Sequence, residues 1–244
     1  PLPWEPGIDP GAITVCRTLE EALLNTEMIL ICVPTPKVGN KLSGDLVKEA
    51  VTQVHSSWPN SDRAVPLIVI ASTLDPREAA DICGPGVVYN PPLIRLGYVR
   101  EDLEHMKLML LGGGWEDCAP VVKLWYPDSM GSPVPVYRRS PQAIALAKLA
   151  INATLSARIA WANDLALVCR EQGVPPPEVL EIVQADPRIG PAYMTPGAPP
   201  GGPCLPRDLD VWVDLVEKDY SPGPTLAASV RDCHETHMQA MVME

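Results

Sequence analysis

The residue best placed for covalent chemistry in this sequence is a cysteine in a loop of glycines and prolines. Residues 196–208 read Pro-Gly-Ala-Pro-Pro-Gly-Gly-Pro-Cys-Leu-Pro-Arg-Asp, and a helix is predicted to follow over residues 209–218. Glycines let backbone approach a ligand closely, and both a helix N-terminus and the neighbouring Arg207 favour a lowered pKa for the thiol of Cys204. Cys204 is therefore a candidate nucleophile. The alternative is a small buried apolar residue, the commoner role of a lone cysteine.

Polar side chains interrupt one face of a long predicted helix. Residues 141–172 are rich in Ala, Leu and Ile, contain proline only at the first position and are closed by Gly173, which predicts a single helix. Within it Lys148, Asn152 and Asn163 lie at helical spacings and share a face. These polar groups either form a solvated edge, with the Lys148 ammonium extended to water, or meet partners across a packed surface.

The first half of the chain predicts strands that alternate with helices. The apolar runs are residues 28–33, 65–71, 87–89, 107–111 and 134–137, and helical windows separate several of them, which predicts an α/β fold with a mostly parallel sheet. In open sheets of this kind ligands lie beyond the carboxyl ends of the strands. Thr35, Ser72 and Thr73 follow two of these runs, so they are candidate binding residues, with ordinary strand-ending turns as an equal alternative.

Composition excludes several classes of partner. Lys plus Arg total 19 against 30 Asp plus Glu, a net charge of −11, which works against binding of nucleic acid. The apolar runs fall far short of the roughly 20 residues that span a membrane, so no membrane partner is expected. Seven cysteines form no CxxC pair and no metal-ligand spacing, so we expect reduced thiols, a cytoplasmic location and no metal site.

Four motifs, taken together and in order, resemble the UDP-glucose/GDP-mannose dehydrogenase family. They are Ile-Cys-Val-Pro-Thr-Pro at 31–36, the pair Lys148 and Asn152, Asp-Pro-Arg-Ile-Gly at 186–190, and Gly-Gly-Pro-Cys-Leu-Pro-Arg-Asp at 201–208. The resemblance covers almost the whole chain. It implies the later part of an NAD-binding Rossmann-like domain over residues 1–138. It also implies an all-helical domain over residues 139–244 that forms a homodimer through the long helix.

The resemblance also implies a reaction and its catalytic residues. Members of the family oxidise C6 of a nucleotide-linked sugar twice, with two NAD molecules as hydride acceptors and with a thiohemiacetal and a thioester on the motif cysteine. Cys204 would be this nucleophile, and Lys148 would stabilise the alkoxide. Asp208 would manage protons together with water, Asn152 would lie in the same site, and Thr73 would lie beside the cofactor and the reacting centre.

Further positions carry over as binding residues. Thr35 and Pro36 should lie against the dinucleotide, with Ser72, Thr73 and Arg207 also near the cofactor. Arg188 matches a substrate-contacting arginine that acts across the dimer interface. The segment from Tyr193 through Gly201 and Gly202 matches backbone that wraps the nucleotide sugar.

Three departures from the family pattern qualify these expectations. The glycine-rich G-x-G-x-x-G loop is not in the sequence, and the three glycines at 112–114 do not replace it, so NAD affinity should fall unless another segment supplies that loop. The family's third, nucleotide-gripping domain is not in the sequence either. Pro92 stands where the family has a glutamate that assists thioester hydrolysis. The alternative function is therefore a catalytically silent dimeric relative that serves as a structural or regulatory partner.

Overall fold

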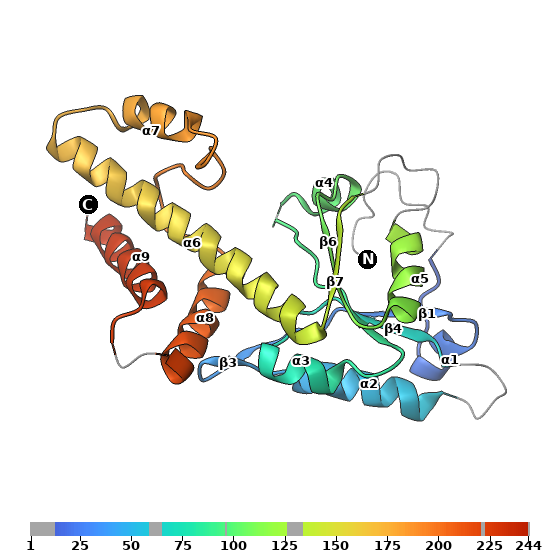
Figure 1. Ribbon diagram of the computed structural model, residues 1–244. Coiled ribbons are helices and arrows are strands. Elements are labelled where there is room, and N and C mark those ends of the chain that lie inside the picture. The colour runs from blue at the N-terminus through green and yellow to red at the C-terminus, as the bar shows by residue number, and fades with distance from the viewer. Residues whose placement is uncertain (1–12, 59–64, 96, 126–133, 221–222, 244) are drawn as a thin grey trace.

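A five-stranded sheet organises the first half of the chain (Figure 1). The computed structural model describes residues 13–58, 65–95, 97–125, 134–220 and 223–243. Within them the sheet has the order β1-β4-β5-β6-β7, with strands β1 Met28–Ile31, β4 Leu67–Ile70, β5 Val87–Tyr89, β6 Met109–Gly112 and β7 Val136–Arg139. Neighbouring strands are parallel except for β5 and β6. The predicted α/β fold with a mostly parallel sheet is confirmed.

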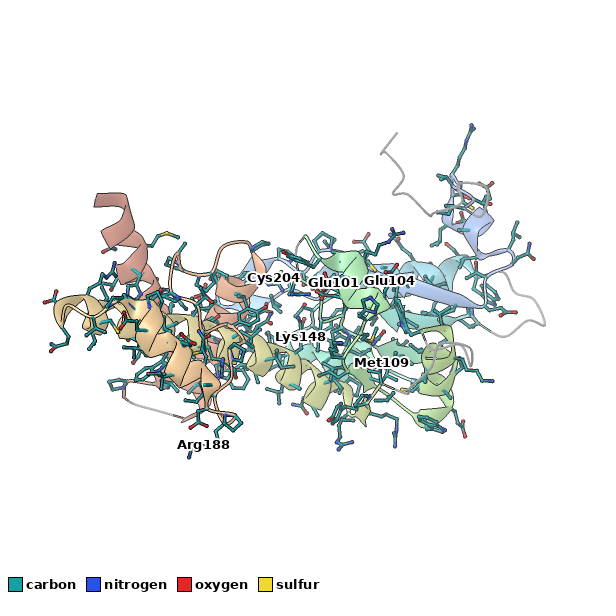
Figure 2. The ribbon with its side chains drawn as sticks, turned by 90° about the horizontal axis from the view of Figure 1, so that it is seen from above. Glu101, Glu104, Met109, Lys148, Arg188 and Cys204 are labelled. Carbon is teal, nitrogen blue, oxygen red and sulfur yellow. The ribbon has the colours of Figure 1, made fainter. Side chains whose placement is uncertain are left out.

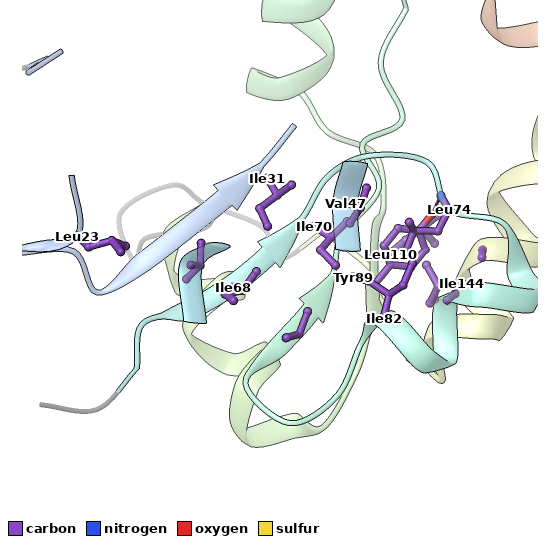
Figure 3. Close-up of a cluster of buried hydrophobic side chains, with 14 residues drawn as sticks. Leu23, Ile31, Val47, Ile68, Ile70, Leu74, Ile82, Tyr89, Leu110 and Ile144 are labelled. Atoms are coloured by element: carbon purple, nitrogen blue, oxygen red, sulfur yellow. Dashed lines mark hydrogen bonds between the residues drawn. The ribbon is translucent and has the colours of Figure 1, made fainter. Parts of the chain in front are cut away.

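Apolar side chains on both faces of the sheet are covered by helices. Because side chains alternate along a strand, Ile68 and Ile70 of β4 join one buried cluster and Val69 joins the other (Figure 3). The first cluster includes residues of α1, α2 and α3, and the second includes residues of α5. The bounds of the helices in this half are α1 Leu19–Leu23, α2 Asp45–Ser57, α3 Pro76–Ile82, α4 Val99–Glu104 and α5 Trp115–Trp125.

The second half of the described chain is helical. Its helices are α6 Pro141–Glu171, α7 Pro176–Ala185, α8 Cys204–Tyr220 and α9 Leu226–Met243. The long helix α6 runs from the sheet to α7 and contacts α3, α8 and α9 on its way (Figure 1). The predicted long helix is confirmed to within one residue. The helix predicted from residue 209 begins five residues earlier, at Cys204. Pro206 does not interrupt it, because this proline lies in the first turn, where a missing backbone N–H costs no helical hydrogen bond.

A short hairpin that the sequence does not predict joins the two halves. Its strands are β2 Lys37–Val38 and β3 Lys41–Leu42, which pair antiparallel through a turn with Gly39 at a φ of 61°. Leu42 is buried in a cluster with Leu149 of α6 and Val211 of α8. The hairpin therefore connects the segment after β1 to α6 and α8.

Helix α6 also has the length and apolar composition of a membrane span, a test that core helices pass as well. In this molecule it packs against other helices along much of its length. Residues such as Ile144, Ala145 and Leu149 are fully buried against the rest of the chain. The first part of α6 therefore packs as core helices do.

The junction between the two halves depends on a glycine. Strand β7 ends at Arg139, Ser140 caps α6 by accepting a hydrogen bond from the backbone N–H of Ala143, and the helix begins at Pro141. A Cβ added at Gly112 would lie 2.7 Å from the backbone Cα of Pro141 and 3.1 Å from the Cβ of Tyr89. The close approach of β6 to the start of α6 therefore requires glycine at position 112.

Replacing Gly112 with alanine should lower the free energy of unfolding. The new methyl group meets backbone atoms that cannot rotate away, and overpacking of this kind costs about 1–3 kcal/mol. Urea denaturation followed by circular dichroism measures the change. Gly84→Ala is the matched control, because a Cβ there has no neighbour within 4 Å and no positive φ. Equal stabilities of the two variants would show that the junction tolerates the extra carbon.

Candidate active site

Most of the predicted site residues line one cavity of about 640 Å³ between the two halves. The walls come from the segments after β1 and β4, from α6, and from the loop that leads into α8. The predicted residues in the lining are Thr35, Ser72, Thr73, Lys148, Asn152, Tyr193, Gly201, Gly202, Cys204 and Arg207. The carboxyl ends of β1 and β4, which are parallel neighbours, thus open onto the same space as the candidate nucleophile.

Cys204 is exposed and is the first residue of α8. The backbone N–H groups of a first helical turn have no intrahelical partner and carry partial positive charge. Cys204 thus meets the cavity at the positive end of α8. Figure 2 shows Cys204 and Lys148 on neighbouring elements in the middle of the molecule.

Lys148 lies in the wall of the cavity and not on a solvated edge, which decides between the two interpretations of its helix face. Burial lowers the pKa of its ammonium group, and the nearby Asp208 and Cys204 act in the opposite direction. A lowered pKa means that the ammonium gives up its proton more readily than that of an exposed lysine. Lys148 can therefore act both as a local positive charge and as a proton donor.

Asp208 has no exposed surface and lies behind the cavity wall. Its Oδ2 accepts a hydrogen bond of 2.6 Å from Nδ2 of Asn152, and its Oδ1 accepts one of 2.9 Å from Nε of Arg207. A buried carboxylate needs such donors, because its desolvation is otherwise uncompensated. Asp208 thus fixes the side chains of Asn152 and Arg207, which do reach the cavity.

The residues after the two strands are held by a cross-strand hydrogen bond. The hydroxyl of Ser72 donates to the carbonyl of Val33 at 2.6 Å, and Thr35 is buried beside it in the cavity wall. Ser72 therefore joins the ends of β1 and β4. Thr73 is half-buried in the same lining.

Besides Asp208, two further predicted site residues do not line the cavity. Pro36 is exposed outside the lining, and its carbonyl accepts a hydrogen bond from Ser43 in the hairpin. The side chain of Arg188 is 87% exposed, pairs with Asp186 at 2.6 Å, and lies far from Cys204 (Figure 2). Within one chain, Arg188 therefore does not line the cavity that contains Cys204.

Arg95 is a cavity residue to which the sequence interpretation assigns no role. Asp102 holds its guanidinium at 2.6 Å, and the ring of Tyr98 lies 4.7 Å beneath it. The one sequence signal for a role of Arg95 is its position three residues after Pro92, in a segment that resembles the family. Pro92 itself lines the cavity, as expected from that resemblance, and offers no ionisable group.

Tyr193 adopts a strained backbone conformation in the cavity wall. Its φ of 58° lies in the left-handed region, which is uncommon for residues other than glycine. Gly202, with a φ of 80°, lies in the same wall. Backbone strain of this kind is concentrated at ligand-binding segments.

Comparison with known proteins finds similarity to one enzyme family. Residues 142–235 match the model of the UDP-glucose/GDP-mannose dehydrogenase family, central domain. The UDP-glucose 6-dehydrogenase AglM of Haloferax volcanii is 29% identical over 92% of this chain and 56% of its own length. The GDP-mannose 6-dehydrogenase of Azotobacter vinelandii is 25% identical over 83% of this chain and 50% of its own length.

A solved structure shows the same architecture. The UDP-glucose dehydrogenase of the hyperthermophilic archaeon Pyrobaculum islandicum superposes with a TM-score of 0.77 and 25% identity, over 93% of this chain and 53% of that one. The chain therefore spans about half the length of the relatives that it matches.

Replacing Asn152 with leucine should destabilise the protein by about 2–3 kcal/mol, because the buried carboxylate of Asp208 loses a charge-assisted hydrogen bond. Urea denaturation measures the change. Thr154→Ala is the control, since Thr154 is exposed on the same helix and bonds only to its own helix at Ala150. An Asn152→Leu variant as stable as this control would mean that Asp208 does not depend on the amide.

Proposed function

Because the chain belongs to the UDP-glucose/GDP-mannose dehydrogenase family, we propose that it forms the core of an NAD-dependent nucleotide-sugar 6-dehydrogenase. The observation that carries this proposal is the cavity that brings Cys204 and Lys148 together with the strand-end residues Thr35 and Thr73. A thiol, a cation and the carboxyl ends of parallel strands in one space suit the two-step oxidation of an alcohol to an acid.

The residues present fit the cofactor and an anionic substrate. Dinucleotides bind beyond the carboxyl ends of parallel strands, and the segments after β1 and β4 form that part of the lining. Arg95 and Arg207 place guanidinium groups in the wall, and such groups suit the diphosphate of a nucleotide sugar. When bound, NAD supplies the hydride acceptor for both oxidations.

In the first oxidation, C6 of the sugar gives up a hydride while its hydroxyl loses a proton, and an aldehyde forms. We assign to Lys148 the stabilisation of the developing alkoxide, since burial makes its charge effective and its proton easily shared. We assign to Asn152, which lines the same cavity, the orientation of this oxygen. Asp208 acts as a positioning residue, because it holds Asn152 and Arg207 from behind the wall.

In the second oxidation, the sulfur of Cys204 adds to the aldehyde carbon to form a thiohemiacetal, so the aldehyde is retained in the site. Loss of a second hydride and of the hydroxyl proton gives a thioester. Water then cleaves the C–S bond, which releases the carboxylate and returns the thiol. Pro92 cannot activate this water, so we expect hydrolysis to be the slow step.

The central test follows NADH absorbance and intact mass when the protein, expressed at its natural length, meets NAD and a panel of nucleotide sugars. Wild type should form NADH, and Cys204→Ala should lose at least about a thousandfold in turnover. Cys16→Ala, which alters a thiol outside the cavity, should keep its activity. A folded wild type that forms no NADH and carries no adduct would favour the catalytically silent partner.

We further propose that two chains form a dimer through α6 and share their sites. Large apolar side chains are exposed along this part of the molecule: Trp161 at 60%, Val168 at 61% and, on α7, Ile182 at 75%. Such a patch suits burial against a second copy. A dimer would also give Arg188, which does not line its own cavity, access to the cavity of its partner.

Mixing two inactive variants tests the shared site. Arg188→Ala and Cys204→Ala should each be inactive alone, whereas heterodimers formed by refolding them together should recover activity at up to about a quarter of the wild-type level. The recovery arises because each mixed dimer holds one intact site. NADH formation measures the recovered activity. A mixture of Arg188→Ala with Lys148→Ala repeats the test with a second pair of variants. If the mixtures stay inactive while each variant is dimeric, Arg188 does not act across the interface.

A further inference from the structure

We propose that two ion pairs act as latches that align helix α8, and with it Cys204, against the cofactor side of the cavity. This makes Lys37 and Arg77 positioning residues for the proposed reaction, on which the inference rests. Each latch ties one strand-end segment of the cavity to the same helix. The first joins Lys37 to Asp210, and the second joins Arg77 to Asp214.

The first latch begins next to a cavity residue. Lys37 follows Thr35 by two positions and starts the hairpin after β1, and its Nζ pairs with Oδ2 of Asp210 on α8. Thr35 lines the cavity that Cys204 also lines. A shift of α8 against the end of β1 would therefore break this pair.

The second latch has the same plan at the next strand. Asp75 follows Thr73 by two positions and caps α3, and Arg77 bridges the carboxylate of Asp75 at 2.7 Å and that of Asp214 at 2.9 Å. The side chains of Asp75 and Asp214 are only 1% and 6% exposed. One guanidinium thus connects the end of β4 to α8 through two buried carboxylates.

Two attachment points restrain α8 more completely than one. Asp210 and Asp214 lie one helical turn apart on one face, at about 9 Å and 15 Å along the axis from Cys204. Contacts with α6 hold α8 on its other side, and either ion pair alone would still let α8 rotate relative to the strand ends. Held at both points, it presents the sulfur of Cys204 at one place relative to the strand ends.

The Lys37–Asp210 pair is the better test of positioning, because its loss should change the position of α8 with little change in stability. Lys37 and Asp210 are 34% and 28% exposed, and partly exposed pairs contribute little to stability. The apolar cluster of Leu42, Leu149 and Val211 still holds the hairpin in place when Lys37 is changed. Loss of Arg77, by contrast, would leave the buried carboxylate of Asp75 without its ion-pair partner and that of Asp214 with Lys218 alone, so it mixes misfolding with misalignment.

A charge exchange tests the first latch in the protein at its natural length. Lys37→Glu and Asp210→Lys should each lower kcat for NADH formation about tenfold or more, because small displacements of reacting groups are costly. The double exchange should restore kcat to within about threefold. KM for the sugar and the thermal midpoint should change little in all three. Lys41→Glu, exposed on the same hairpin, is the control and should keep its kcat.

A second measurement separates failure of the latch from failure of the proposed function. Cys32 and Cys204 are exposed, so spin labels attach to both once the half-buried Cys16, Cys83 and Cys233 are alanine. The distance between the labels should be narrowly distributed in this background. It should broaden with Lys37→Glu and narrow again with the double exchange.

Each outcome of the two experiments has a defined meaning. If wild type forms no NADH, but the label distance broadens with Lys37→Glu and narrows with the double exchange, the proposed function is overturned and the latch is supported. Active protein in which neither kcat nor the distance distribution responds to the single exchanges overturns the latch. A fall in kcat that the double exchange does not restore assigns the effect to the individual side chains and likewise overturns it.

Discussion

The arrangement of the site depends on the hydrogen bonds that compensate the buried negative charge of Asp208. Asp208 has no exposed surface, and its carboxylate is held by Asn152 from α6 and by Arg207 from α8. Separation of the two helices would leave Oδ2 of this carboxylate without its donor on α6, at a cost of about 2–3 kcal/mol, while Arg207 of α8 still holds Oδ1. Lys148 lies one turn before Asn152 on α6, and Cys204 lies one turn before Asp208 on α8. The two reactive groups are therefore placed by the two ends of a single hydrogen bond.

Local patterns of sequence were sufficient to predict the large elements. The long helix is an uninterrupted run of helix-forming residues closed by Gly173, and the strand at residues 87–89 is a short apolar run; both are found within one residue of their predicted bounds. The hairpin at residues 37–42 escapes prediction because strands of two residues hold no period. Helix α9 is not predicted either, since polar residues are spread around it. The predicted start of α8 is too late, because Pro206 is typical of a loop, although proline is tolerated in a first helical turn.

Sequence reasoning identified which residues belong to the site, but not how they are arranged in space. Residue types and the family resemblance single out Cys204, Lys148 and Thr73, which line the cavity. They do not reveal that Asp208 lies behind the wall or that Arg188 points away from it. Contacts such as Lys37 with Asp210 join positions separated by 173 residues, and no pattern in a single sequence indicates pairs so far apart.

The junction between the sheet and α6 determines how the molecule can move. Ser140 is the only residue between β7 and α6, and it is committed to capping the helix. The ring of Pro141 restricts its own φ, and Gly112 is in close contact with its backbone. A hinge needs residues that are free to change φ and ψ, and this junction has none. The sheet and α6 are therefore joined by a stiff connection, and we expect molecules to enter the cavity without closure of one half over the other.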